Sequence, residues 1–211
     1  MVTHIETYIA GPVKANNYLF CDYKTKEAVI IDCSAYNPRM LKFIKDNELT
    51  VRYILLTHGH FDHILGVNEM KKELNVKAYI HKNDLKLAQN MVEFMNAFGI
   101  PTDGLENPQI DDTLDNLTDL MLGENQIKII DTPGHTKGSV SYLIEKSMFC
   151  GDTIFRKSFG RTDLPGGSFE EIKHSIKNII FPMDGSISLY TGHGEFTTIG
   201  YENQFNAILQ H

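Results

Sequence analysis

The chain has 211 residues, of which 42% are hydrophobic and 22% are charged, and its net charge is −7. These values are typical of a globular protein with a sizeable core, and they exclude a disordered or fibrous chain. No apolar run approaches the roughly 18 residues that span a bilayer, and the N-terminus lacks the pattern of a signal peptide. We therefore expect a cytoplasmic protein without a membrane partner.

The negative charge is concentrated in one part of the chain. Between Leu87 and Ile127 there are eight acidic residues and no Lys or Arg, so the rest of the chain carries a net charge of +1. An acidic surface repels the phosphate backbone, which argues against a nucleic-acid partner. A solvated acidic face is our preferred interpretation of this segment, and it requires no function.

Short apolar runs alternate with helical patterns along the whole chain. Runs rich in Ile, Val, Tyr and Phe predict strands at 17–22, 27–32, 52–57, 76–81, 126–131, 139–144, 148–150 and 187–190. Helical spacing predicts helices at 38–47, 64–74, 83–97, 169–180 and 201–209. This interleaving is typical of the α/β class, with sheets covered by helices, and we expect a single domain over residues 1–211.

Two further features concern the core and the middle of the chain. The three cysteines, Cys21, Cys33 and Cys150, lie in or beside apolar runs without Cys-x-x-Cys spacing, and we interpret them as reduced core thiols. Prolines, glycines and acidic residues interrupt any clear period in residues 94–122. This segment could form a lid, surface packing with short helices, or a subunit contact, and the oligomeric state, monomer or dimer, stays open.

The densest group of chemically active side chains is Thr57-His-Gly-His-Phe-Asp-His63, directly after the predicted strand 52–57. Three imidazoles and one carboxylate within six positions are typical of a metal site. Taken alone, Asp62 could instead cap the helix that follows.

Three more predicted strands end beside a residue that can bind a metal: His135, Asp152 and His193. Loops at the end of a rigid sheet often carry binding groups, and the flanking glycines allow close approach of the backbone. Singly, Asp152 could be a turn residue and His193 a solvated loop histidine. Together with the first motif there are seven donors, which exceeds the needs of one zinc and suits two metals that share a bridging carboxylate.

In order and context these residues resemble the metal-ligand signature of the metallo-β-lactamase superfamily. The resemblance covers nearly the whole chain and implies an αββα sandwich, with the metals at one edge between two mixed sheets. It implies a first metal held by His58, His60 and His135, a second held by Asp62, His63 and His193, and a bridging Asp152. Imidazole and carboxylate ligands suit two divalent ions, with zinc as our first choice and iron or manganese as alternatives.

Three phrases, at 133–139, 151–155 and 160–167, resemble the glyoxalase II group, the hydroxyacylglutathione hydrolases. Only 18 residues follow His193, so the resemblance is to the short form, which lacks the C-terminal helical segment that helps to bind glutathione. It implies hydrolysis of a small thioester, such as an S-2-hydroxyacylglutathione. Arg161 stands where such proteins often carry a basic residue for an anionic substrate tail, which an arginine can bind through its planar fork.

The predicted chemistry fits a thioester. Two metals can lower the pKa of a bridging water to about 7, and the resulting hydroxide can attack the carbonyl carbon. A thiol with a pKa near 8.5 then leaves without a general acid. We expect Asp62 to be catalytic as well as a ligand, because its carboxylate could orient the hydroxide. Asp32 is either a partner of a ligand histidine or a turn residue.

The main alternative is an oxidoreductase on the same fold. Persulfide dioxygenases use a single iron, held by groups equivalent to His58, His135 and Asp152. They typically read Gly-Arg-Thr-Asp-Phe-Gln where this chain has Gly-Arg-Thr-Asp-Leu-Pro at 160–165, which favours the hydrolase. A scaffold protein without turnover is disfavoured, because a structural zinc needs only four ligands.

Overall fold

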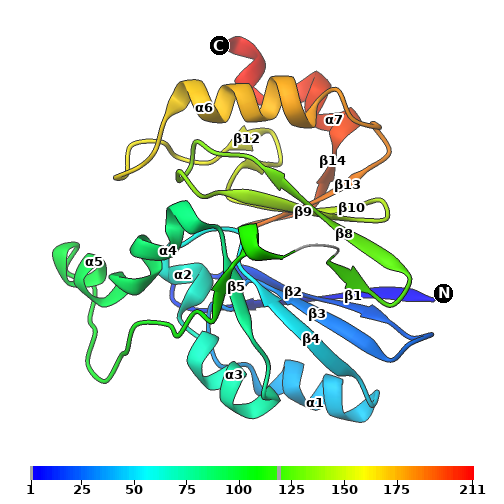
Figure 1. The fold of residues 1–211 in the computed structure, drawn as a ribbon. Coiled ribbons are helices and arrows are strands. Elements are labelled where there is room, and N and C mark those ends of the chain that lie inside the picture. Colours follow the sequence, from blue (N-terminus) through cyan, green and yellow to red (C-terminus); the bar gives the residue numbers. More distant parts are fainter. Residues whose placement is uncertain (1, 118–119) are drawn as a thin grey trace. The chain divides into compact units, whose positions relative to one another are not determined.

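The computed structural model describes residues 2–117 and 120–211. The chain divides into two compact units. Unit 1 comprises Met1–Thr118 and Leu122–Glu124, and unit 2 comprises Asp119–Met121 and Asn125–His211. Each unit is built around one six-stranded sheet, drawn in Figure 1.

The sheet of unit 1 has the strand order β1-β2-β3-β4-β5-β6. Its strands are β1 (Thr3–Ala10), β2 (Ala15–Asp22), β3 (Glu27–Ile31), β4 (Thr50–Leu55), β5 (Ala78–Ile80) and β6 (Asp112–Thr113). The first three strands pair antiparallel and the later pairs are parallel, so the sheet is mixed. Every residue of β2 is buried, including the polar Asn16, Asn17 and Asp22.

Helices cover one face of this sheet. They are α1 (Pro38–Asp46), α2 (Phe61–Ile64), α3 (Val67–Leu74), α4 (Lys82–Gln89) and α5 (Met91–Ala97). The side chain of Asn37 caps α1 by accepting the N–H of Met40, and Pro38 occupies the first turn, where it costs no hydrogen bond. Buried side chains from α1, α3 and α5 join those of β3, β4 and β5 in one apolar cluster. Figure 1 shows α1 and α3 along the same side of the strands.

Two predicted helices are each split in the structure. The helix predicted at 64–74 is interrupted at Gly66, where an added Cβ would lie 2.2 Å from the carbonyl carbon of Ala35. The helix predicted at 83–97 becomes α4 and α5, joined at Asn90. The sequence also missed β1, an edge strand that pairs with β2 over eight residues and is mostly half-buried.

The second sheet, which is formed by unit 2 apart from Leu122, has the strand order β14-β13-β10-β9-β8-β7. Its strands are β7 (Met121–Leu122), β8 (Asn125–Asp131), β9 (Val140–Ile144), β10 (Ser147–Gly151), β13 (Ser188–Thr191) and β14 (Thr197–Thr198). Here β10 and β13 are parallel while the pairs β8–β9, β9–β10 and β13–β14 are antiparallel, so this sheet is mixed as well. A separate hairpin of β11 (Ile154–Phe155) and β12 (Ser158–Phe159) follows β10.

Helices also flank the second sheet. Ser168 caps α6 (Phe169–His174), which continues as a π-helical segment over Ser175–Ile180. The last elements are α7 (Ile199–Phe205) and a 3₁₀ turn at Ala207–Gln210. Buried isoleucines of α6, α7 and the π-helical segment pack with Met148, Cys150 and Leu189 of the sheet. Two mixed sheets flanked by helices confirm the predicted fold class.

Residues 94–122 contain the end of α5, β6, a 3₁₀ turn at Leu114–Asn116 and β7, while 118 and 119 lie outside the described residues. The three cysteines are free and buried, as predicted. Burial raises the pKa of the Cys21 thiol to about 12 and raises the pKa of the other two thiols as well. In the part of the chain that the structure describes, no helix has both the length and the apolar character needed to cross a membrane.

Candidate metal centre

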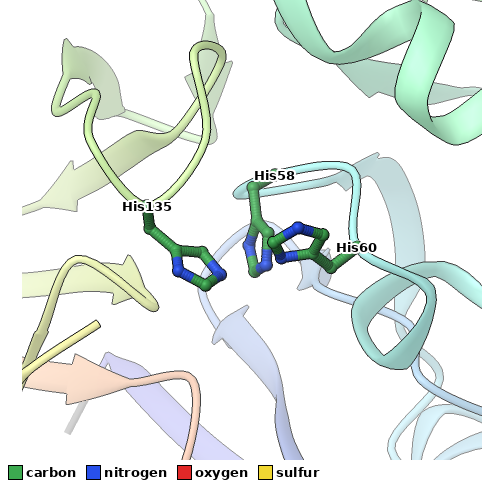
Figure 2. Close-up of side chains that lie close together, drawn as sticks. All are labelled: His58, His60 and His135. Atoms are coloured by element: carbon green, nitrogen blue, oxygen red, sulfur yellow. The ribbon is translucent and has the colours of Figure 1, made fainter. Parts of the chain in front are cut away.

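Unit 1 gathers four of the predicted ligands on one short stretch after β4. His58 and His60 lie on the loop and Asp62 and His63 lie on α2 (Figure 2 draws the two loop histidines). All four are buried, with exposed fractions of 9% or less. The ligand atoms of His58 and His60 lie within 4.8 Å of each other, as do those of His58 and His63 and those of Asp62 and His63. Unit 1 therefore holds a compact set of imidazole and carboxylate donors.

A single carboxylate orients two of these histidines. Asp32, 1% exposed at the end of β3, accepts hydrogen bonds from the backbone N–H of Thr57 (2.8 Å), the hydroxyl of Thr57 (2.7 Å) and Nδ1 of His63 (2.8 Å). Because the Thr57 hydroxyl gives its proton to Asp32, it must accept from Nδ1 of His58, at 3.1 Å. Both histidines then carry their proton on Nδ1, which leaves the Nε2 lone pair as the one that can bind a metal.

The loop between the two histidines is fixed from α4. Asp84, buried on this helix, accepts the backbone N–H of Gly59 at 2.8 Å. A Cβ on Gly59 would lie 3.0 Å from the carbonyl oxygen of Asp84 and 3.3 Å from the backbone nitrogen of Ala88, which is tight for any side chain. The glycine of the His-Gly-His sequence thus allows the loop to pack closely against the helix.

Unit 2 gathers the other three predicted ligands from three separate strand ends. His135 follows β8 (Figure 2), Asp152 follows β10 and His193 follows β13. Oδ2 of Asp152 lies 3.6 Å from Nε2 of His135 and 3.6 Å from Nε2 of His193. Two ligand atoms on one metal, each about 2.1 Å from it, are separated by about 3.4 Å in tetrahedral geometry. One oxygen at this distance from both imidazoles suits the bridging role predicted for Asp152.

The orientation of His135 depends on the backbone rather than on a side chain. Its Nδ1 donates to the carbonyl oxygen of Arg161 at 2.8 Å, which again leaves the Nε2 lone pair for a metal. The preceding residue must be glycine, because a Cβ on Gly160 would lie 1.8 Å from the carbonyl oxygen of Asp152 and 3.3 Å from Nδ1 of His135. The chain at 160–161 therefore packs directly against two predicted ligands.

The side chain of Arg161 lies in a surface ion pair. Its guanidinium donates to both carboxylate oxygens of Asp163, from Nε and Nη2, at 2.7 Å each. These hydrogen bonds lower the pKa of Asp163 to about 2. The guanidinium of Arg161, which was predicted to bind an anionic substrate tail, thus binds the carboxylate of Asp163 in the same chain.

The donor sets of both units fit divalent metals such as zinc or iron, which bind imidazole nitrogen and carboxylate oxygen. Among the described residues, three buried side-chain atoms form no hydrogen bond, namely Nε2 of His58, Nε2 of His60 and Oδ1 of Asp152, although all three residues have other contacts. Sequence reasoning did not identify the roles of Thr57, Asp84 and Gly160. Thr57 precedes the histidine motif and Gly160 opens the phrase at 160–167, so the sequence indicated that both could lie near the site. Nothing in the sequence around Asp84 indicated its role.

Comparison with known proteins identifies the family of the chain. The profile of the Metallo-beta-lactamase superfamily matches residues 10–193. Hydroxyacylglutathione hydrolase GloC of Haemophilus influenzae is 31% identical over 188 residues, which cover 87% of this chain and 88% of GloC.

Two solved structures are similar over almost their full lengths. BLEG-1, a B3 metallo-β-lactamase, has a TM-score of 0.89 at 33% identity, with 99% of this chain and 100% of that chain covered. TTHA1623, in a di-iron-bound form, has a TM-score of 0.81 at 29% identity, with 96% and 98% covered. The chain has the metallo-β-lactamase fold and belongs to the metallo-β-lactamase superfamily.

Proposed function

We propose that this protein is a dinuclear metal-dependent hydrolase that cleaves a small thioester, of the S-2-hydroxyacylglutathione type. The observation that carries the proposal is the pair of preorganised donor sets, in which histidine Nδ1 atoms are engaged and one Asp152 oxygen lies 3.6 Å from two Nε2 atoms. Similarity to GloC supports the thioester as substrate. The proposed partner is this small molecule, rather than nucleic acid or a membrane, and the proposed location is the cytoplasm.

The proposed ligands divide the two donor sets between two ions. His58, His60 and His135 would hold the first ion, Asp62, His63 and His193 the second, and Asp152 would bridge them. Zinc is our first choice, and iron or manganese are alternatives, because imidazole and carboxylate ligands suit all three metals. The di-iron-bound form of TTHA1623 supports iron as an alternative. When bound, such ions lower the pKa of water to about 7 and polarise a carbonyl oxygen.

The residues of the chain supply the rest of the chemistry. Asp62 has a carboxylate that could accept the proton of the attacking water and so orient it toward the carbonyl carbon. The leaving thiolate needs no proton donor, since its conjugate acid has a pKa near 8.5. Arg161 would bind an anionic tail of the substrate, whose carboxylate would replace that of Asp163 in the guanidinium fork.

Hydrolysis of β-lactams is a second candidate, because BLEG-1 is similar over the full length of the chain. The same attack on a carbonyl carbon would open the ring. An amide nitrogen, however, is a poor leaving group that needs a proton or a cation to stabilise it, and a thiolate leaves without this help. The thioester therefore remains the preferred substrate.

The proposal is tested on purified protein whose metals are counted. Hydrolysis of S-lactoylglutathione is measured beside hydrolysis of a chromogenic cephalosporin and oxygen uptake with glutathione persulfide. We expect about two metals per chain, thioester hydrolysis that is abolished by a chelator and restored by zinc, and no oxygen uptake. Oxygen uptake with one iron per chain would replace the hydrolase by the dioxygenase.

Substitution of Asp62 then tests its catalytic role. In Asp62→Asn the side chain keeps its size but loses the carboxylate, so kcat should fall by about 10²-fold or more while KM changes little. Metal content is measured on the same sample. Unchanged kcat in a fully metallated variant would remove Asp62 from the mechanism.

A further inference from the structure

Two phenylalanines extend from one of the predicted metal ligands to the protein surface. The ring of Phe94 stacks on the ring of His60, with centroids 5.9 Å apart and an interplanar angle of 29°. The ring of Phe98 lies 4.6 Å from that of Phe94. His60 is 4% exposed and Phe98 is 55% exposed. A continuous row of three rings therefore connects the donor set of unit 1 to solvent.

The backbone holds these two rings in place. Met91 and Met95, one helical turn apart on α5, are both buried in the core of unit 1. Phe94 lies on α5 and Phe98, four residues later, is the C-cap residue of this helix, so the two side chains project from the same side. The N–H of Phe98 bonds to the carbonyl oxygens of Phe94 and Met95, and the N–H of Ile100 also bonds to that of Met95. Phe98 is thus exposed at the C-terminal end of α5, where its backbone N–H is hydrogen-bonded to the helix.

The segment that carries these rings offers no cation to an anionic ligand. The sequence from 88 to 126 contains no Lys or Arg, and the exposed Glu93 directly precedes Phe94. The face of an aromatic ring also carries partial negative charge. An apolar, uncharged ligand group therefore suits Phe98 better than a carboxylate of a glutathione-like carrier, which would find no cation on this segment.

We propose that Phe94 and Phe98 form an acyl subsite, which accepts an uncharged aryl group on the acyl side of the substrate. This subsite rests on the proposed thioester hydrolysis. The acyl substituent is bonded directly to the reacting carbonyl carbon, and Phe94 lies one ring contact from the ligand His60. An acyl phenyl group then packs beside Phe98, whose ring is available for an offset or edge contact.

The test compares two thioesters that share one thiol and differ by one phenyl group, S-mandeloylglutathione and S-lactoylglutathione. In Phe98→Ala, kcat/KM for the mandeloyl substrate should fall about three- to tenfold, the range of one aromatic contact, and kcat/KM for the lactoyl substrate less than about twofold. Phe205→Ala is the matched control, because Phe205 is also 55% exposed and also packs on a neighbouring ring, that of Tyr201, in unit 2. This control should leave both values unchanged.

Binding of the two product acids separates the subsite from the reaction. Calorimetry measures the Kd of mandelate and of lactate for the protein with its metals. Wild type and Phe205→Ala should bind mandelate more tightly than lactate, and Phe98→Ala should lose this preference. If neither thioester is cleaved, the proposed function fails. The Kd values of mandelate and lactate then still test the subsite. Equal binding of the two acids by wild type, or a preference that survives in Phe98→Ala, would overturn it.

Discussion

The two units prepare their predicted ligands in different ways. In unit 1 the four donors lie within six positions of the chain, and the side chain of Asp32 fixes the proton position on two histidines, one of them through Thr57. In unit 2 the three donors come from three strand ends, and a backbone carbonyl, that of Arg161, fixes His135. The orientation of His58 and His63 in unit 1 therefore depends on one carboxylate, and that of His135 in unit 2 depends on the path of the main chain.

This difference predicts which substitutions each unit tolerates. In unit 1 a substitution of one buried side chain removes the orientation of two ligands at once. In unit 2 the side chain of Arg161 can be removed without loss of the hydrogen bond to His135, because the acceptor is the backbone carbonyl oxygen of Arg161. In unit 2 we therefore expect substitutions to disturb the predicted ligands most at positions whose backbone contacts them closely, such as Gly160.

The largest effect is expected for Asp32→Ala. It leaves three donors without their acceptor in a buried site, two on Thr57 and one on His63. The free energy of unfolding should fall by about 3 to 5 kcal/mol, the usual cost of breaking a buried charged network. Metal affinity should fall about 10- to 100-fold, as for other partners of ligand histidines. Urea unfolding of the metal-free protein and metal titration measure the two effects separately.

Asp22→Ala is the control for this substitution. Asp22 is equally buried, at 2% exposure, in the same sheet, and it accepts the backbone N–H of Lys24 rather than a ligand histidine. It should lower stability and leave metal affinity unchanged. Equal loss of metal affinity in both variants would show that Asp32 acts only through stability.

A smaller effect is expected for Gly160→Ala in unit 2. The new Cβ would lie 1.8 Å from the carbonyl oxygen of Asp152, so the chain must move away from both Asp152 and His135. Overpacking of this kind costs about 1 to 3 kcal/mol. Metal content should fall as the hydrogen bond to His135 lengthens. Gly185→Ala is the control, since its Cβ would come no closer than 3.3 Å to another atom, and normal metal content in Gly160→Ala would contradict the main-chain argument.

The sequence predicted most of the central strands and the donors that follow a strand end, His58, His135, Asp152 and His193, because apolar runs and residue types are local signals. It could not predict the break at Gly66, whose backbone N–H bonds to the carbonyl oxygen of Cys33 at 2.8 Å, a contact that depends on the tertiary fold. It also left open whether Asp32 contacts a predicted ligand, and the structure shows a hydrogen bond between Asp32 and one of them, His63. The partner of His135 had no signal at all, because every residue has a backbone carbonyl.

The smallest effect on the metal site is expected for Arg161→Ala. The carbonyl oxygen that holds His135 remains, and the ion pair with Asp163 is exposed, so neither the metal content nor the unfolding transition should change measurably. If the guanidinium binds the anionic tail of the thioester, KM for S-lactoylglutathione should rise about tenfold with little change in kcat.

Arg156→Ala is the matched control, since this arginine of unit 2 also forms a surface ion pair, with Glu195. It should change neither KM nor metal content. An unchanged KM in Arg161→Ala would show that the guanidinium does not bind the substrate. The role of residue 161 would then be limited to its backbone carbonyl oxygen. A loss of metal in Arg161→Ala would instead contradict the contrast between the two units, because the side chain would then be needed to hold the carbonyl oxygen against His135.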